Sequence, residues 1–220
     1  CQWQHMNYQS QLFYKQQEVV NNLKRLGGIV PEETLPILGC EKPYFYRNKI
    51  EFSFSETRWL TPEEIASKET IGTRNGLGFH IAGAWDKVLD IHKCHLQQDP
   101  SNAIRNTLKA YALSQGYTFY NPRTHTGWLR TIMIHITSLG ELMVVIQFLE
   151  EQQHEREQLL DYLLAQFPQI TSLQYIINNK PNDTIYDQEV ICYHGRDFIY
   201  EQMEGLRFKI NAKSFFQTNS

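Results

Sequence analysis

Residues 129–149, LRTIMIHITSLGELMVVIQFL, carry the strongest structural signal in the chain. Two runs rich in β-branched and other apolar residues, 129–137 and 142–149, flank the turn Ser138-Leu139-Gly140-Glu141. β-Branched residues favour strands, and a short turn that contains glycine favours the connection of two antiparallel strands. This stretch therefore predicts a β-hairpin.

Further strands are predicted on both sides of the hairpin. Before it, residues 48–56 alternate Ile50, Phe52 and Phe54 with polar residues, which is the period of a strand with one buried face. The other predicted strands are 77–81, 87–91, 173–178, 189–194, 198–203 and 206–210. Turn-forming residues separate the last four of them.

Four segments have the pattern of helices. Residues 7–26 carry apolar side chains at roughly helical spacing and end at Gly27-Gly28, which predicts a long amphipathic helix. Thr61-Pro62-Glu63-Glu64 opens a short helix, because it combines a capping residue, a first-turn proline and acidic residues. The other predicted helices are 101–115 and 155–167. The sum is an α+β fold with a largely antiparallel sheet and flanking helices.

The composition bounds the class of protein. The 220 residues are 41% hydrophobic and 20% charged, as in a water-soluble globular protein. No apolar run approaches the roughly 20 residues needed to cross a bilayer, and the first residues lack a secretion signal. We expect a cytoplasmic protein with no membrane and no obligate protein partner. The net charge of −3 excludes a uniformly basic surface but permits a local basic stripe.

The four cysteines, Cys1, Cys40, Cys94 and Cys192, are far apart in the sequence. This argues against a disulfide framework and favours reduced thiols or cluster ligands. No Gly-rich strand-to-helix turn of the nucleotide-binding type occurs, so no complete cofactor pocket is visible. The chain begins without Met and ends without a helix stop signal, and both features predict a piece of a longer protein.

Three stretches, in order along the chain, resemble the RNA 5-methyluridine methyltransferases that act on ribosomal and transfer RNA. The first is Cys1-Gln2-Trp3-Gln4-His5-Met6 with the helix that follows it. The second is Tyr46-Arg47-Asn48-Lys49-Ile50-Glu51-Phe52-Ser53, with Gly78-Phe79-His80 and Asp90-Ile91-His92-Lys93-Cys94 downstream. The third is Gly205-Leu206-Arg207-Phe208-Lys209-Ile210 with Ser214-Phe215-Phe216-Gln217-Thr218-Asn219. Gly127-Trp128-Leu129-Arg130 is a further landmark, so the resemblance spans essentially the whole chain.

The resemblance implies a domain organisation. Residues 1–40 would be a leading segment with the amphipathic helix, 41–210 the central α+β domain, and 211–220 the start of a junction into a catalytic domain. A Rossmann-like methyltransferase domain, absent here, would follow Ser220 and carry the catalytic cysteine, the general base and most of the cofactor pocket. No catalytic residue is therefore expected in this fragment, which would itself be inactive.

The same resemblance implies a reaction for the full-length protein, the transfer of a methyl group from S-adenosylmethionine to C5 of a uridine in RNA. A cysteine thiolate adds to C6 and makes C5 electron-rich enough to attack the methyl group, and a base then removes the C5 proton.

An iron-sulfur cluster is implied as well. Some family members bind a [4Fe-4S] cluster through four thiolates. Cys1 matches the last of three clustered ligands and Cys94 the distant fourth, a pattern of the 23S ribosomal RNA branch. Because this chain has only two of the four ligands, we expect it to hold no stable cluster. The alternative is that Cys94 is a small buried residue and that Cys1 belongs to a frayed terminus. Cys40 and Cys192 match no ligand position and are predicted to be structural.

The third stretch supplies candidate contacts to cofactor and base. Gln217 matches a glutamine at the cofactor and target-base site, and its amide can donate and accept at once. Phe215 or Phe216 is predicted to stack on an extruded base, with core packing as the alternative for at least one of them.

Basic residues on or beside predicted strands are candidates to bind RNA phosphates. They are Arg47, Lys49, Arg130, Lys209 and Lys213, with Tyr46 and Trp128 as flat surfaces beside them. Solvated surface charge is the alternative for each lysine. His5, His80, His92 and His95 form no metal-ligand pattern and are predicted to pack or to form hydrogen bonds.

Other functions stay open at this point. One is a non-catalytic RNA-binding module, and another is a transfer-RNA uridine-5-methyltransferase, a branch whose members typically lack the cluster. A purely structural domain is the third. The residues that follow Ser220 would discriminate between enzyme and module, because only an enzyme needs a cofactor-binding domain there.

Overall fold

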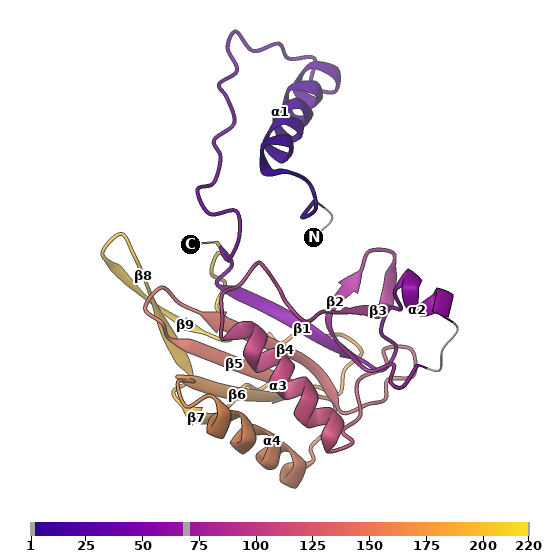
Figure 1. Ribbon diagram of the computed structural model, residues 1–220. Helices are drawn as coiled ribbons and strands as arrows, with labels where there is room; N and C mark the ends of the chain where they lie inside the picture. The colour runs from indigo at the N-terminus through magenta and orange to yellow at the C-terminus, as the bar shows by residue number, and fades with distance from the viewer. Residues whose placement is uncertain (1–2, 68–70, 220) are drawn as a thin grey trace. The chain divides into compact units, whose positions relative to one another are not determined.

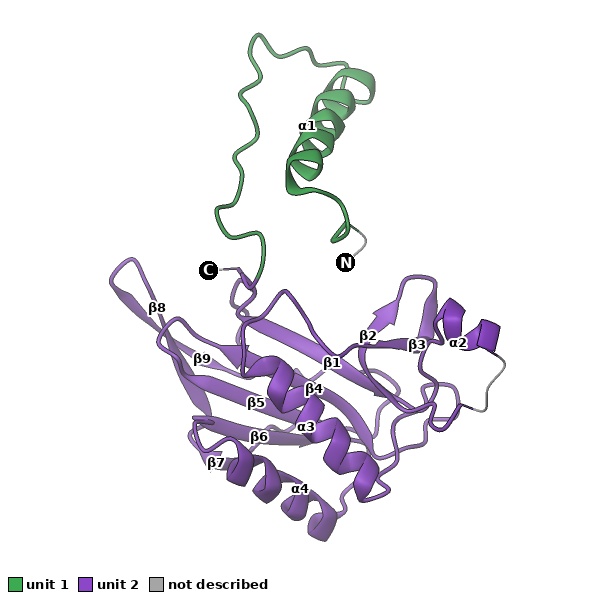
Figure 2. Cartoon of the chain, viewed as in Figure 1, with its two compact units in different colours: residues 1–44 green, residues 45–220 purple. Residues whose placement is uncertain are grey.

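The computed structural model of the protein describes residues 3–67 and 71–219. The chain forms two compact units, residues 1–44 and 45–220, which Figure 2 colours separately. The division falls after Tyr44, whereas the sequence places a boundary after residue 40. Each unit is described by itself.

The first unit contains helix α1, Tyr8–Arg25. The Asn7 side chain accepts a hydrogen bond from the Gln9 backbone N–H at 2.9 Å and caps the helix. The segment after the helix folds back on it without regular structure. There the Cys40 N–H donates to the Tyr8 hydroxyl at 2.6 Å, and the Gln16 amide donates to the Leu35 carbonyl at 3.0 Å. The predicted long helix and the irregular segment after it are both confirmed.

The second unit is built on a seven-stranded sheet with the strand order β3-β2-β1-β4-β5-β6-β7. All neighbouring strands pair antiparallel except β5 and β6, which are parallel. The strands are β1 Lys49–Ser55, β2 Gly76–Ile81, β3 Ala84–Asp90, β4 Leu129–Ile136, β5 Leu142–Phe148, β6 Ser172–Ile177 and β7 Ile191–Gly195. The expectation of a largely antiparallel sheet is confirmed.

Strands β4 and β5 form the predicted hairpin at the centre of this sheet. Ile132 pairs with Ile146 and Ile134 with Val144, and every residue of both strands is buried. The turn requires Gly140, whose φ of 76° is accessible to glycine at little cost. Because both faces are covered, the strands are continuous apolar runs with few polar interruptions.

Two helices cover one face of the sheet, as Figure 1 shows. They are α3, Ser101–Ser114, and α4, Gln153–Gln166. Leu108 of α3 and Leu159 of α4 are fully buried in one core with the inward residues of β1, β4 and β5. Helix α4 connects β5 to β6, and such a crossover over one face brings the two strands into parallel pairing.

A short helix and a separate hairpin complete the unit. Helix α2, Pro62–Ser67, begins with a capping box, in which Thr61 Oγ1 accepts from the Glu64 N–H and the Glu64 carboxylate accepts from the Thr61 N–H. Strands β8 Phe198–Met203 and β9 Leu206–Asn211 form a two-stranded sheet of their own. Ile199 and Ile210 of this hairpin pack with Met143 and Val145 against the face of the large sheet that the helices leave free.

Within the described part of the chain, no helix has the length and apolar character required to cross a membrane.

Candidate functional site

Asn48 joins two segments that are far apart in the sequence. Its backbone N–H donates to the Thr218 carbonyl and its side-chain amide donates to the Gln217 carbonyl, both at 2.8 Å. Asn48 is buried, lies directly before β1 and belongs to the second resembling stretch. The two bonds fix the backbone of residues 217–218 beside the start of β1.

A third segment supports Asn48 from the other side. Gln97 is fully buried, and its amide donates to the Asn48 carbonyl at 2.8 Å and to the Ile134 carbonyl at 2.9 Å. The backbone N–H groups of Phe45 and Arg47 donate to the carbonyls of His95 and Leu96 at 2.9 and 2.8 Å. Residues 45–49, 92–97 and 214–219 therefore lie together, and we call this cluster the junction site.

The two phenylalanines of the junction site have different environments. Phe216 is half-buried, packs on the core beneath the β8–β9 hairpin and lies with its ring centroid 5.9 Å from that of Phe208. Phe215 is 81% exposed. The sequence left open which ring packs in the core, and the structure assigns this role to Phe216. Phe215 and the exposed Gln217 remain accessible to a ligand.

The junction site also contains positive charge. Arg47 and Lys49 are half-buried, and the pKa of Lys49 is lowered mainly by burial, with the Arg47 charge adding to the effect and Glu51 opposing it. Among the described residues the buried Nε of Arg47 has no hydrogen-bond acceptor. The junction site thus combines two cations with an exposed ring and an exposed amide.

Arg130 does not lie on the surface that the sequence predicts. Its side chain is 1% exposed, and its guanidinium donates to the carbonyls of Asn178, Lys180 and Asn182 and to the Asp183 carboxylate. Five donors in a planar fork suit this task, because they satisfy several buried carbonyls at once. Arg130 therefore holds the loop after β6 and is removed from the predicted phosphate track.

Trp128 is also buried, and its indole N–H donates to the Glu150 carbonyl at 3.1 Å, so it offers no flat surface to RNA. Tyr46 is exposed, as predicted. Lys213 is half-buried and donates through Nζ to the Gln188 carbonyl at 2.5 Å. His5, His80 and His92 are exposed and do not pack in the core, so for them the predicted role is hydrogen bonding, whereas the His95 ring lies against Phe45 with 6.2 Å between centroids.

Cys94 is 4% exposed and belongs to the apolar core under the helices. Its N–H and C=O both bind the Asn102 side chain, at 2.6 and 3.1 Å. Cys1 lies outside the described residues. Cys40 and Cys192 are exposed, so their predicted structural role does not include core packing.

A [4Fe-4S] cluster needs four thiolates. Within residues 3–67 and 71–219 no three His, Cys, Asp or Glu side chains come together as a metal site. The described residues do not fit the cluster.

A separate pocket of about 370 Å³ lies along the other half of β1. It is lined by Ser53, Ser55, His80, Trp85, Tyr120, His125, Pro181 and Asp183, with Arg130 among its walls. Ser53, the first residue of β1 in the lining, is five residues from Asn48, so the pocket begins roughly 17 Å along the strand from the junction site. The sequence did not predict it, because its walls come from five segments with no shared motif.

No protein-family model matches the chain. Over its whole length the chain is 52% identical to a protein of Porphyromonas gingivalis and 51% identical to one of Bacteroides thetaiotaomicron, both named uncharacterized RNA methyltransferases. It covers 48% and 49% of these two proteins. A protein of Chlorobaculum tepidum with the same description is 34% identical and is covered to 46%.

One solved structure has a similar fold. It is the crystal structure of Pyrococcus abyssi tRNA (uracil-54, C5)-methyltransferase in complex with S-adenosyl-L-homocysteine, with a TM-score of 0.68 and 24% sequence identity. The match covers 98% of this chain and 46% of that protein. The chain spans about half the length of the relatives it matches. Over its whole length it is homologous to one part of proteins that are named RNA methyltransferases.

Proposed function

We propose that this chain is part of an enzyme that transfers a methyl group from S-adenosylmethionine to C5 of a uridine in RNA. The observation that carries the proposal is the 52% identity, along the whole chain, to a protein named an RNA methyltransferase. Two further observations support it. The fold is similar to that of a uracil C5-methyltransferase, and the second and third of the stretches that resemble this family meet at the junction site.

The chain's own residues would position the RNA and would form one wall of the cofactor site. Phe215 presents an exposed ring on which an unstacked base can lie, and such stacking is worth roughly 1–3 kcal/mol per base. Arg47 and Lys49 add charge for a phosphate beside it. The Asn48 side chain holds the backbone of Gln217, so the backbone from which the exposed Gln217 amide extends has a fixed position. S-adenosylmethionine would supply the methyl group.

The fit to S-adenosylmethionine is partial. Gln217 is exposed and its amide can bind the polar end of the cofactor. The described residues bring one such group to the junction site, and the 370 Å³ pocket lies elsewhere on β1. The greater part of the cofactor site is therefore assigned to residues outside this chain.

Ribosomal RNA is the first proposed substrate, on the pattern around Cys1 and Cys94. Transfer RNA is the second candidate, because the solved structure with a similar fold is named a tRNA methyltransferase. The cluster that would mark the ribosomal branch is tested separately. Protein expressed without oxygen from the whole reading frame would contain close to four iron atoms per chain if the cluster is present.

The proposal is tested by methyl transfer. Full-length protein is incubated with labelled S-adenosylmethionine and unmodified ribosomal or transfer RNA, and the RNA is digested to nucleosides. We expect labelled 5-methyluridine from one of the two RNAs. Phe215→Ala should lower kcat/KM roughly tenfold, since it removes one base-stacking surface. The matched control is Tyr186→Ala, which removes a 68% exposed ring from another loop and should leave kcat/KM unchanged.

Two results would contradict the proposal. Tight RNA binding without methyl transfer would favour the non-catalytic module. Label in a nucleoside other than 5-methyluridine would retain the methyltransferase and exclude the uridine C5 reaction.

A further inference from the structure

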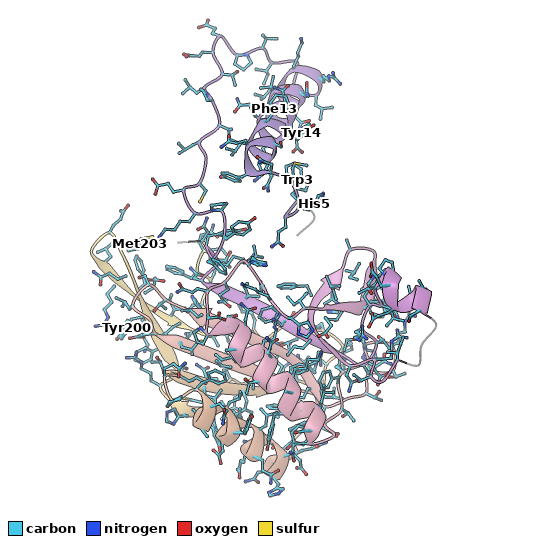
Figure 3. All side chains as sticks on the ribbon, viewed as in Figure 1. Trp3, His5, Phe13, Tyr14, Tyr200 and Met203 are labelled. Atoms are coloured by element: carbon cyan, nitrogen blue, oxygen red, sulfur yellow. The ribbon has the colours of Figure 1, made fainter. Side chains whose placement is uncertain are left out.

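The β8–β9 hairpin has one buried and one outward side. Tyr200 pairs with Lys209 across the hairpin, and Gln202 pairs with Arg207. Successive residues of a strand point to opposite sides. Since Ile199, Glu201 and Ile210 are buried toward the large sheet, Tyr200 and its neighbours at alternate positions point away from it. Figure 3 labels Tyr200 on this hairpin.

Cations and aromatic rings alternate on the outward side. The Arg207 guanidinium lies 3.8 Å from the Tyr200 ring centroid, and Lys209 Nζ lies 4.1 Å from that of Phe198. The guanidinium of Arg196, two residues before β8, lies 5.0 Å from the ring centroid of Phe198 and 5.3 Å from that of Tyr200. The two rings meet edge to face with centroids 5.1 Å apart. We call these five residues, Arg196, Phe198, Tyr200, Arg207 and Lys209, the hairpin face.

The positive charge of the hairpin face is largely uncompensated. Arg196 forms an ion pair with Glu141 at 2.5 Å. Among the residues that the structure describes, neither Arg207 nor Lys209 has an acidic partner. A ring orients a cation without neutralising it. In a chain with a net charge of −3, two oriented and unpaired cations on one exposed surface fit an anionic partner.

Packing alone gives a weaker account of this arrangement. Long basic side chains do cover aromatic rings with their apolar stems. In the described chain, however, four of the eight cation–ring contacts fall on this one hairpin. A surface that needed only to shield two rings would be covered equally well by uncharged side chains, without the repulsion between neighbouring cations.

We propose that the hairpin face binds the phosphodiester backbone of a single-stranded RNA segment. Guanidinium and ammonium groups donate to phosphate oxygens, and flat guanidinium and aromatic planes stack with the adjacent bases. Strand β9 leads directly into residues 212–219, so the hairpin face and Phe215 lie on one continuous piece of chain. The inference rests on the proposed function and extends the RNA contact beyond the target base.

The test measures RNA binding by the full-length protein as a function of salt, with a single-stranded oligoribonucleotide as the probe. Each phosphate contact adds about 0.7 to the slope of log K against log salt. The double variant R207Q/K209Q should therefore lower the magnitude of this slope by about 1.4. The charge-preserving variant R207K/K209R should keep the wild-type slope. The matched control, K24Q/R25Q, removes two charges from the exposed end of α1 and should also keep it.

An unchanged slope in R207Q/K209Q would overturn the inference, as would an equal fall in K24Q/R25Q. If R207Q/K209Q lost binding to an acidic protein but bound RNA as the wild type does, this result would overturn the inference in favour of a protein partner. Methyl transfer by the wild type is measured in parallel. Transfer with an unchanged slope in R207Q/K209Q refutes the hairpin face alone, whereas a lowered slope without any transfer refutes the proposed function and supports the RNA surface.

Discussion

At the scale of single residues, Asn48 is the residue on which the junction site depends. It donates two hydrogen bonds to residues 217 and 218, and its carbonyl accepts one from the buried Gln97. The bond from the Asn48 side chain to the Gln217 carbonyl is part-buried, and loss of its donor leaves that carbonyl without compensation. Asn48 therefore couples the stability of the unit to the position of Gln217.

Asn48→Ala should lower the free energy of unfolding by about 1–2 kcal/mol, because it removes the side-chain bond and leaves the Gln217 carbonyl without this donor. Urea unfolding of the 220-residue chain measures the change. Asn22→Ala is the control, since Asn22 is exposed on α1 and alanine is the better helix former. Equal stability of Asn48→Ala and wild type would contradict this role of Asn48.

The sequence predicted part of the junction site and missed the rest for identifiable reasons. Phe215, Phe216 and Gln217 stand in a motif, but only packing on Phe208 shows which ring is buried. Arg130 has the same local context as a surface arginine on a strand, and its burial depends on the loop at residues 178–183, which no local pattern connects to it. Gln97 is a polar residue in an irregular segment, without any periodic signal.

At the scale of elements, the pairing of β1 with β4 places Lys49 opposite His135. His135 is 1% exposed, and burial, with the Lys49 charge in second place, lowers its pKa to about 4 from the ordinary 6.5. A neutral imidazole is therefore held inside the sheet at neutral pH. The unfolded chain binds a proton at this residue between pH 6.5 and 4, where the folded chain does not.

Stability should consequently decrease as the pH falls through this window. At about 1.4 kcal/mol per pKa unit, protonation of His135 in the unfolded chain should lower the free energy of unfolding by about 2 kcal/mol as the pH falls from 7 to 5. Urea unfolding at both pH values tests this. His135→Gln, which does not titrate, should show a pH dependence smaller by that amount, while the control His194→Gln, at an exposed position of β7, should match wild type. Equal pH dependence in all three proteins would show that His135 is not held neutral.

Most helices and strands were predictable because their signals are local. The predicted range 129–137 became β4 at Leu129–Ile136, and the predicted helix 101–115 became α3 at Ser101–Ser114. Strand order and the separate β8–β9 sheet were not predictable, because they depend on which faces bury one another. The parallel pairing of β5 with β6 also depends on tertiary packing, although helix α4 between them was predicted.

At the scale of the whole molecule, the chain spans about half the length of the relatives it matches. Its second unit has a complete core on both faces of the sheet, and its junction site presents Phe215 and Gln217 next to residues 218–219. Under the proposed function, Phe215 would contact the RNA and Gln217 the cofactor. If the proposed function holds, 5-methyluridine in cellular RNA depends on this protein.

The most direct measurement is nucleoside analysis of RNA from a strain that lacks the gene. Ribosomal and transfer RNA are purified separately, and 5-methyluridine is quantified by mass spectrometry in the wild type, the deletion strain and the strain complemented with the gene. We predict that 5-methyluridine falls in one RNA fraction, ribosomal RNA first, and returns on complementation with the wild-type gene but less completely with Phe215→Ala. Unchanged 5-methyluridine in both fractions would contradict the proposed function.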